Sequence, residues 1–147
     1  MPYWEVFTPV NAYTVEDKKA FADAITKACV EFAEIPAFFV NVRFQEMPEN
    51  TMFLGGEPAT NFVRIVADTI ARQMPTPEIR AACMAFIGEV VRPFLTDRGF
   101  DWEIHIDETP VELWRVNGIK APLDDPELFE QWIKENRAIP WEEVPAS

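Results

Sequence analysis

The chain has 147 residues, a length that suits one domain with its own hydrophobic core. Apolar residues make up 48% of it, which excludes an intrinsically disordered composition, and no apolar run is long enough to cross a bilayer. The formal net charge of −12 argues against a nucleic-acid partner, because phosphate binding requires basic surface patches.

The first 45 residues predict a strand, a helix and a second strand. Residues 3–8 alternate as in a short strand, and Thr14 is a predicted N-cap for a helix whose apolar stripe ends before Pro36. The helix is long enough to cross over, so we expect the two strands to be parallel. The second strand should carry Phe38, Val40, Val42 and Phe44 on one face, and Phe39, Asn41, Arg43 and Gln45 on the other.

The same plan repeats after a loop rich in Pro, Gly and Asn at residues 46–61. Residues 62–68 predict a strand, and Thr76-Pro77-Glu78 marks the start of a helix that Pro93 should kink or end. Residues 101–107 alternate as a further strand. Two β-α-β units therefore predict an α/β fold of two layers, with a four-stranded sheet and two helices on one face.

Past Pro110 the chain changes character. Residues 111–114 fit either a short helical turn or an added edge strand, and residues 125–137 predict a third helix. Pro140, Trp141 and Pro145 mark an irregular tail. We expect residues 1–118 to form the tandem β-α-β domain, and residues 119–147 to form a C-terminal helical extension and tail of that same domain.

The two cysteines, Cys29 and Cys83, both fall inside predicted helices. No charged leader followed by an apolar segment precedes the first strand, so we expect a cytoplasmic protein without a membrane partner. In that compartment the cysteines should be buried thiols rather than a disulfide.

Pro2 is the first candidate for chemistry. If Met1 is removed, Pro2 becomes the amino terminus, and its nitrogen is a secondary amine at the start of a strand. An α-amino group titrates at about 7.7–8.0, so such an amine can exchange a proton near neutral pH. Proline after Met is common, however, so Pro2 alone is a weak signal.

The sheet face that the two helices leave uncovered mixes charge with aromatic residues. Arg43, Arg64 and His105 should lie there among Tyr3, Phe39, Phe62 and Val66. This mixture favours burial in an oligomer around a pocket, and two guanidinium groups beside an imidazole could bind a carboxylate. Equally, the arginines could pair with the many acidic residues, and the single histidine could be structural. No nucleophile triad, metal-ligand cluster or phosphate loop is visible.

These features resemble the tautomerase superfamily, and within it the branch of cis-3-chloroacrylic acid dehalogenase and the oxalocrotonate tautomerase group. The resemblance rests on Pro2, Val42-Arg43-Phe44-Gln45-Glu46, Phe53-Leu54-Gly55-Gly56, Phe62-Val63-Arg64-Ile65-Val66, residues 101–110 and residues 113–118, and it spans residues 2–137. It implies a tautomerase (MIF-like) fold, a homotrimer and a catalytic amino-terminal proline.

The resemblance also assigns candidate site residues. Pro2 matches the catalytic proline, and Arg64 and Arg72 lie where the dehalogenase branch carries paired substrate-binding arginines. His105 falls where that branch has a tyrosine that helps to position water or substrate. Two positions depart from the dehalogenase pattern: Cys29 stands in place of a histidine and Val116 in place of the water-activating glutamate.

We therefore expect a cofactor-independent tautomerase or isomerase that acts on small keto or enol carboxylates, with Pro2 as general base. Arg64 and Arg72 should bind the carboxylate, His105 should orient the carbonyl or act as a second acid or base, and Asn117 should add a hydrogen bond. No metal or organic cofactor is needed. The alternatives are a hydratase, decarboxylase or weak dehalogenase for three-carbon acids with Pro2 as acid, and a non-catalytic trimeric scaffold.

Overall fold

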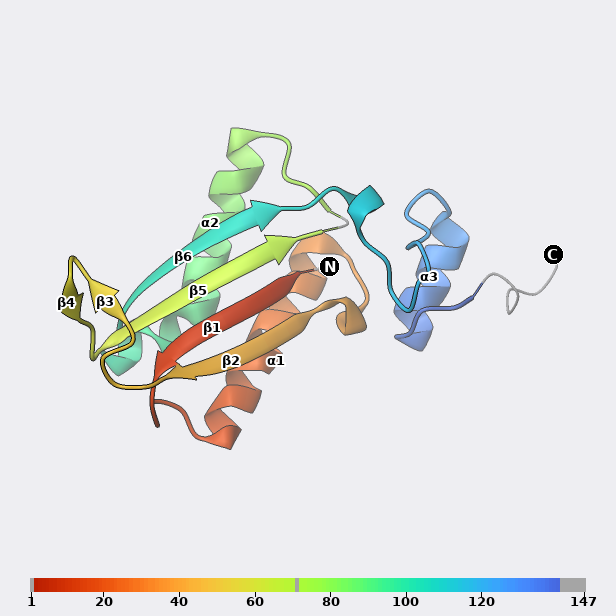
Figure 1. The fold of residues 1–147 in the computed structure, drawn as a ribbon. Coiled ribbons are helices and arrows are strands. Elements are labelled where there is room, and N and C mark those ends of the chain that lie inside the picture. Colours follow the sequence, from red (N-terminus) through yellow and green to blue (C-terminus); the bar gives the residue numbers. More distant parts are fainter. Residues whose placement is uncertain (1, 71, 141–147) are drawn as a thin grey trace.

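The computed structural model describes residues 2–70 and 72–140. Its main sheet has the strand order β2-β1-β5-β6, built from Asn41–Met47, Tyr3–Pro9, Phe62–Thr69 and Asp101–Glu108 (Figure 1). β1 and β2 are parallel, as are β5 and β6, while β1 and β5 are antiparallel at the centre. The predicted pair of β-α-β units is confirmed, and the antiparallel contact joins them.

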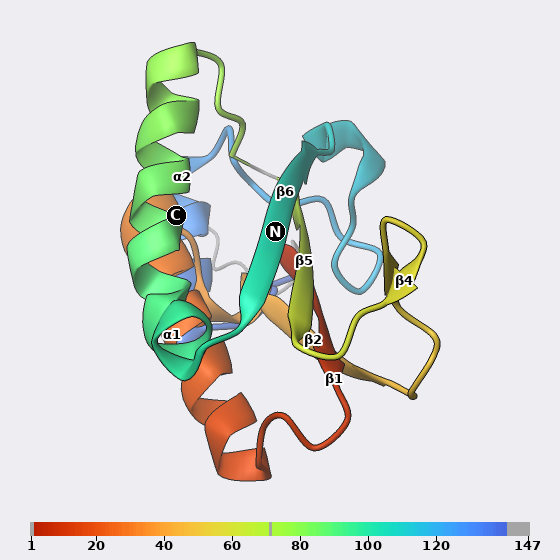
Figure 2. The ribbon, with the colours of Figure 1, turned by 90° about the vertical axis from the view of Figure 1, so that its left-hand side faces the viewer.

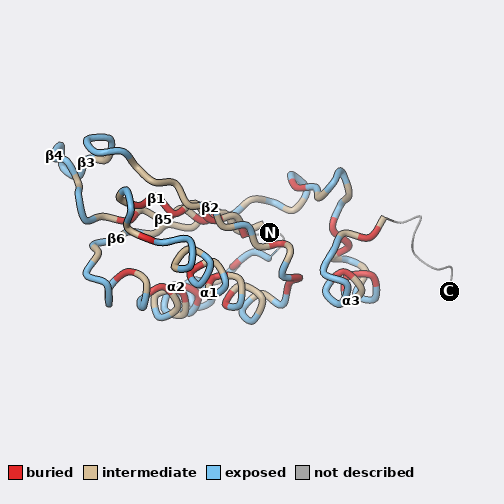
Figure 3. Tube along the Cα trace, turned by 90° about the horizontal axis from the view of Figure 1, so that it is seen from below, coloured by how far each residue is buried: buried red, intermediate tan, exposed pale blue. Residues whose placement is uncertain are grey.

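Two helices cover one face of this sheet, as predicted (Figures 2 and 3). α1 spans Val15–Ala33 and begins with a capping box, in which Thr14 and Asp17 bind each other's backbone N–H. α2 spans Pro77–Val91, with Thr76 as its N-cap and proline in the first turn. Both starts are as the sequence predicts, because each cap satisfies N–H groups that a helix leaves unpaired.

The main core lies between the sheet and these helices. Every second residue of β1 and β5 is buried against them, while the intervening residues are half-buried on the uncovered face. The buried apolar residues of the two central strands are Trp4, Val6, Val63, Ile65 and Ala67, which pack in one cluster with Phe21 and Ile25 of α1. This alternation decides which side chains can reach the space between sheet and helices.

Short elements shape the connections. The predicted loop at residues 46–61 contains a small hairpin, β3 (Phe53–Leu54) and β4 (Glu57–Pro58). Its turn needs glycine, since Gly55 and Gly56 have φ of 58° and 87°. The 3₁₀ turns η2 (Arg92–Phe94) and η3 (Thr96–Arg98) follow α2, so Pro93 does end that helix.

The C-terminal part forms a second core. Residues Val111–Leu113 form the 3₁₀ turn η4, which decides between the two structures that the sequence allowed, and α3 spans Pro126–Glu135. The predicted tail residues Trp141 and Pro145 lie outside the described residues.

Phe39 corrects the sequence prediction. It was expected on the uncovered sheet face, but it belongs to the 3₁₀ turn η1 (Ala37–Phe39) and is fully buried. The Phe39 N–H donates to the Pro36 carbonyl at 3.1 Å, and because of this turn β2 begins only at Asn41. The Phe39 ring meets Trp114 edge-on at 4.8 Å and lies within 6.2 Å of Phe129 and Trp132. Phe39 therefore joins the C-terminal part to the domain.

None of the helices in residues 2–70 and 72–140 is both long and apolar enough to span a membrane. Cys29 and Cys83 are free thiols, as predicted, on α1 and α2.

We expect Phe39→Ala to lower the free energy of unfolding by about 3–5 kcal/mol, because it empties the centre of an aromatic cluster. Phe53→Ala is the matched control, since this ring is 52% exposed and its loss should cost little. Denaturant unfolding of both variants measures the difference. Equal costs would contradict the assignment of Phe39 as the centre of the second core.

Candidate active site

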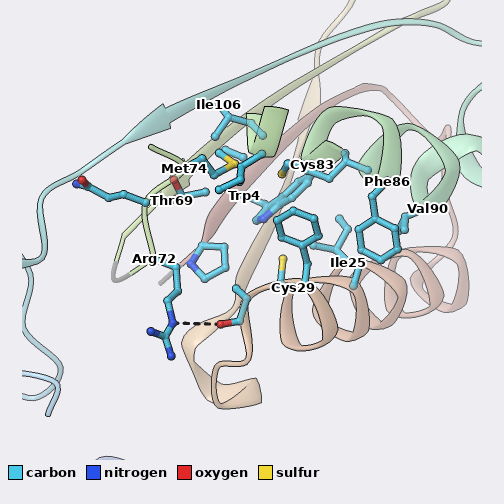
Figure 4. Close-up of a pocket in the computed structure, with 18 of the residues that line it drawn as sticks. Trp4, Ile25, Cys29, Thr69, Arg72, Met74, Cys83, Phe86, Val90 and Ile106 are labelled. Atoms are coloured by element: carbon cyan, nitrogen blue, oxygen red, sulfur yellow. Dashed lines mark hydrogen bonds between the residues drawn. The ribbon is translucent and has the colours of Figure 1, made fainter. Parts of the chain in front are cut away.

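A cavity of about 310 Å³ lies between the sheet and the two helices, close to the start of β1 (Figure 4). Pro2, directly before β1, lines it together with Trp4 of β1, Cys29 and Phe32 of α1, and Cys83 and Phe86 of α2. Its walls are mainly apolar with few polar groups, as is common for small-molecule sites.

Pro2 is held in this wall by the sheet. It is buried, and its carbonyl accepts a hydrogen bond of 3.0 Å from the Asn41 N–H at the start of β2. Pro2 directly precedes β1 and is two residues from Trp4, and both are buried, so their side chains share the face that the helices cover. The period of the strand therefore aims Pro2 into the cavity.

Arg72 brings a positive charge to the mouth of the same cavity. Its Nε donates to the Ala33 carbonyl at 3.2 Å, near the C-terminal end of α1, where helix carbonyls lack intrahelical partners (Figure 4). Its guanidinium carbon also lies 5.4 Å from the centre of the Phe129 ring on α3. Two elements far apart in sequence thus hold one arginine beside Pro2.

Arg64 and His105 lie on the other face of the sheet. Both side chains contact only near neighbours on this face. Arg64 forms an ion pair with Glu103, its Nη2 lies 2.5 Å from His105 Nδ1, and His105 Nε2 lies 3.4 Å from the Asp107 carboxylate. Arg64 is five residues along β5 from Thr69, a cavity residue, or about 17 Å. Within one copy of the chain, the structure does not bring these two side chains to Pro2.

Of the other positions singled out from the sequence, some line the cavity and some do not. Asn117 is exposed, has φ of 50° and forms the turn that the Val116–Ile119 bridge closes, so it does not line the cavity. Val116 packs on the second core instead. Cys29 does line the cavity with Pro2.

Both cavity thiols are protonated at neutral pH. Burial raises the pKa of Cys29 to about 12, against a smaller opposite effect of the nearby Trp4 indole, and burial also raises the pKa of Cys83. A neutral thiol cannot polarise water as a charged group can, so Cys29 adds apolar character to the site. Among the described residues, no cluster of three His, Cys, Asp or Glu side chains is arranged to hold a metal ion.

The sequence interpretation missed several cavity residues. Phe32 on α1 and Phe86 on α2 stack at 5.7 Å and form a wall of the cavity. Trp4 lines it from β1, and Glu34 brings a carboxylate from the C-cap of α1. A helical stripe reports which face is apolar, but it cannot say whether that face fills a core or leaves a cavity.

Comparison with known proteins places the chain in a family. Residues 1–137 match the family described as "Putative oxalocrotonate tautomerase enzyme", so the chain belongs to this family of the tautomerase superfamily. None of the functionally curated proteins that were compared matches the chain.

Solved structures agree with this assignment. RhCC from Rhodococcus jostii RHA1 is 49% identical, with a TM-score of 0.90 over 95% of this chain and 99% of that chain. A probable enzyme from the fungus Aspergillus fumigatus is 37% identical, with a TM-score of 0.89 over 96% and 98%. N1, a member of the cis-3-chloroacrylic acid dehalogenase family, shares the fold at 21% identity, with a TM-score of 0.71 over 91% and 97%. The predicted fold and superfamily are confirmed.

The thiol environment gives a test of the cavity. We expect iodoacetamide to alkylate Cys29 and Cys83 in the native protein at pH 8.5 at least tenfold more slowly than in denaturant, because the native thiols are protonated and buried. Mass spectrometry of modified peptides measures both rates. Rapid native alkylation would contradict this environment.

The same raised pKa values should make the free energy of unfolding fall as pH rises above about 9, since the thiols of the unfolded state then lose their protons first.

Proposed function

We propose that the protein is a cofactor-independent tautomerase or isomerase for small keto or enol carboxylates, with Pro2 as its general base after removal of Met1. The observation that carries the proposal is the shared cavity of Pro2 and Arg72. A base in the wall and a cation at the mouth then share one mainly apolar cavity, which suits proton transfer on a conjugated acid.

The reaction needs little beyond these groups. The apolar wall and a nearby guanidinium both favour a neutral amine over an ammonium at Pro2. Pro2 takes a proton from the enol hydroxyl, or from the carbon next to the carbonyl, and returns it elsewhere on the same conjugated system. Arg72 binds the carboxylate and stabilises the negative charge that develops on the enolate.

Water-adding chemistry has less support. A hydratase or hydrolytic dehalogenase needs a group that activates water as well as an acid. Val116, in place of the water-activating glutamate, packs on the second core, and Cys29, in place of the histidine, is a neutral thiol in the cavity. Glu34 is the one carboxylate among the described residues that line the cavity, and it is exposed at the mouth.

A homotrimer is part of the proposal. The uncovered face of the sheet carries Tyr3, Phe7 and Phe62, half-buried in one copy, next to the Arg64–His105 contact. Assembly would cover these aromatic side chains. Arg64, His105 and Asn117 would contribute to a Pro2 site only from a neighbouring copy.

Pro2→Ala should abolish enol–keto turnover of phenylenolpyruvate, because it replaces the secondary amine that acts as base. Protein that retains Met1 should be equally inactive, since its Pro2 nitrogen is an amide. Ultraviolet absorbance follows the turnover, and intact-mass measurement establishes the amino terminus. Pro48→Ala, in an exposed loop, serves as the control and should keep full activity. Undiminished turnover by either Pro2 form would rule out Pro2 as the base.

Arg72→Ala should raise KM for phenylenolpyruvate roughly tenfold or more, because a hydrogen bond to a charged group contributes about 1.5–3 kcal/mol. Arg115→Ala is the matched control: its guanidinium also donates to backbone carbonyls, at 2.7 Å to Trp114 and 3.2 Å to Glu112, but it does not line the cavity. Steady-state kinetics compare the two. A KM for Arg72→Ala equal to that of Arg115→Ala would remove Arg72 from substrate binding. Arg64→Ala tests separately whether a neighbouring copy contributes.

A further inference from the structure

Trp4 has a buried polar atom without a partner. Its side chain is 3% exposed, and its Nε1 makes no hydrogen bond in the described structure. Buried N–H groups are nearly always paired, because an unpaired buried donor has lost its bonds to water. We therefore expect the Trp4 N–H to have a hydrogen-bond acceptor when the protein is at work.

The position of Trp4 says where that acceptor must come from. Trp4 lines the Pro2 cavity, and Figure 4 shows its indole nitrogen on the side of the ring toward Cys29 and Arg72. The Cys29 thiol is near enough to the indole for a weak N–H···S interaction that lowers the pKa of Cys29, but the two groups do not meet full hydrogen-bond geometry, and sulfur is a weak acceptor. An oxygen atom of a molecule in the cavity would satisfy the N–H.

Trp132 differs from Trp4 in its access to the cavity. Its Nε1 is also buried without a partner, but the ring is fully buried in the second core, and it does not line the Pro2 cavity. The two tryptophans thus share an unpaired indole N–H and differ in access to a ligand. Trp132 is a natural control for Trp4.

We infer that Trp4 is a substrate-binding residue whose indole N–H donates a hydrogen bond to the oxygen at C2 of a 2-oxo or 2-enol acid. The inference rests on the proposed function, in which Arg72 binds the carboxylate of the substrate and Pro2 transfers the proton. Pro2 and Trp4 lie on one strand face about 7 Å apart, so one small acid can reach both. The apolar walls, including Phe32 and Phe86, take the hydrocarbon end of the molecule.

This contact specifies the substrate class. An acid without an oxygen at C2 leaves the Trp4 donor unpaired in a buried site, and sites built to bind an oxygen discriminate strongly against analogues that lack it. The protein should therefore prefer phenylpyruvate to 3-phenylpropanoate, which has the same carboxylate and ring but no oxo group.

The first experiment is an NMR titration of the full chain labelled with ¹⁵N at tryptophan. Phenylpyruvate should move the Trp4 indole signal and leave the Trp132 signal in place, with both signals assigned from Trp4→Phe and Trp132→Phe. Titration with 3-phenylpropanoate should move the Trp4 signal less. A Trp4 signal that stays still while other signals show saturation overturns the inference, as does failure of phenylpyruvate to bind.

The second experiment compares dissociation constants. Wild-type protein should bind phenylpyruvate at least roughly fivefold more tightly than 3-phenylpropanoate. Trp4→Phe should bring that ratio close to one, while Trp132→Phe should keep it. A ratio that survives in Trp4→Phe overturns the inference even if both affinities fall, because a general loss of packing weakens the two ligands alike.

The same titration on Pro2→Ala separates this inference from the proposed function. Binding and the Trp4 signal do not require the base, so both should persist in that variant. If Pro2→Ala retains turnover and its Trp4 signal responds to phenylpyruvate, the assignment of Pro2 as the base fails and the inference about Trp4 stands. If Pro2→Ala loses turnover and the Trp4 signal does not respond in wild-type protein, the base is supported and the inference fails.

Discussion

The placement of β1 at the centre of the sheet is the constraint on which the site depends. β1 pairs with β2 on one side and β5 on the other, so its backbone is fixed from the Pro2 carbonyl onward. Alternation along the strand then sends Pro2, Trp4 and Val6 toward the helices. A shift of one residue in that register would turn Pro2 to the opposite face.

α1 and α2 leave the space next to the start of β1 unfilled, and this space is the cavity. Further along the strand, Val6 packs in the core with Phe21, and neither residue lines the cavity. Near Pro2 the same layers leave a cavity between Cys29 on α1 and Cys83 on α2. The thiols are neutral, so the positive charge at this space comes from Arg72 at its mouth. The layer between sheet and helices thus provides both a packed core and a mainly apolar cavity.

The C-terminal extension takes part in the site through Arg72. Phe129 on α3 lies under the guanidinium, while Phe39, Trp114 and Trp132 hold α3 against the domain. The Ala33 carbonyl fixes the same guanidinium from the end of α1. The second core therefore does more than lengthen the chain, since it positions a cation beside the cavity.

Local patterns in the sequence determined the elements: the caps at Thr14 and Thr76, the strand alternation and the two β-α-β units follow from short-range physical chemistry. Family resemblance added Pro2 as a candidate base and Arg64 and Arg72 as candidate substrate-binding residues. Only the tertiary structure could decide that Arg72 and not Arg64 lies by Pro2 in one copy, that Phe39 leaves the sheet for a second core, and that the Trp4 N–H faces a cavity. These outcomes depend on packing between segments far apart in the chain, and periodicity along one segment carries no information about what the opposite wall leaves empty.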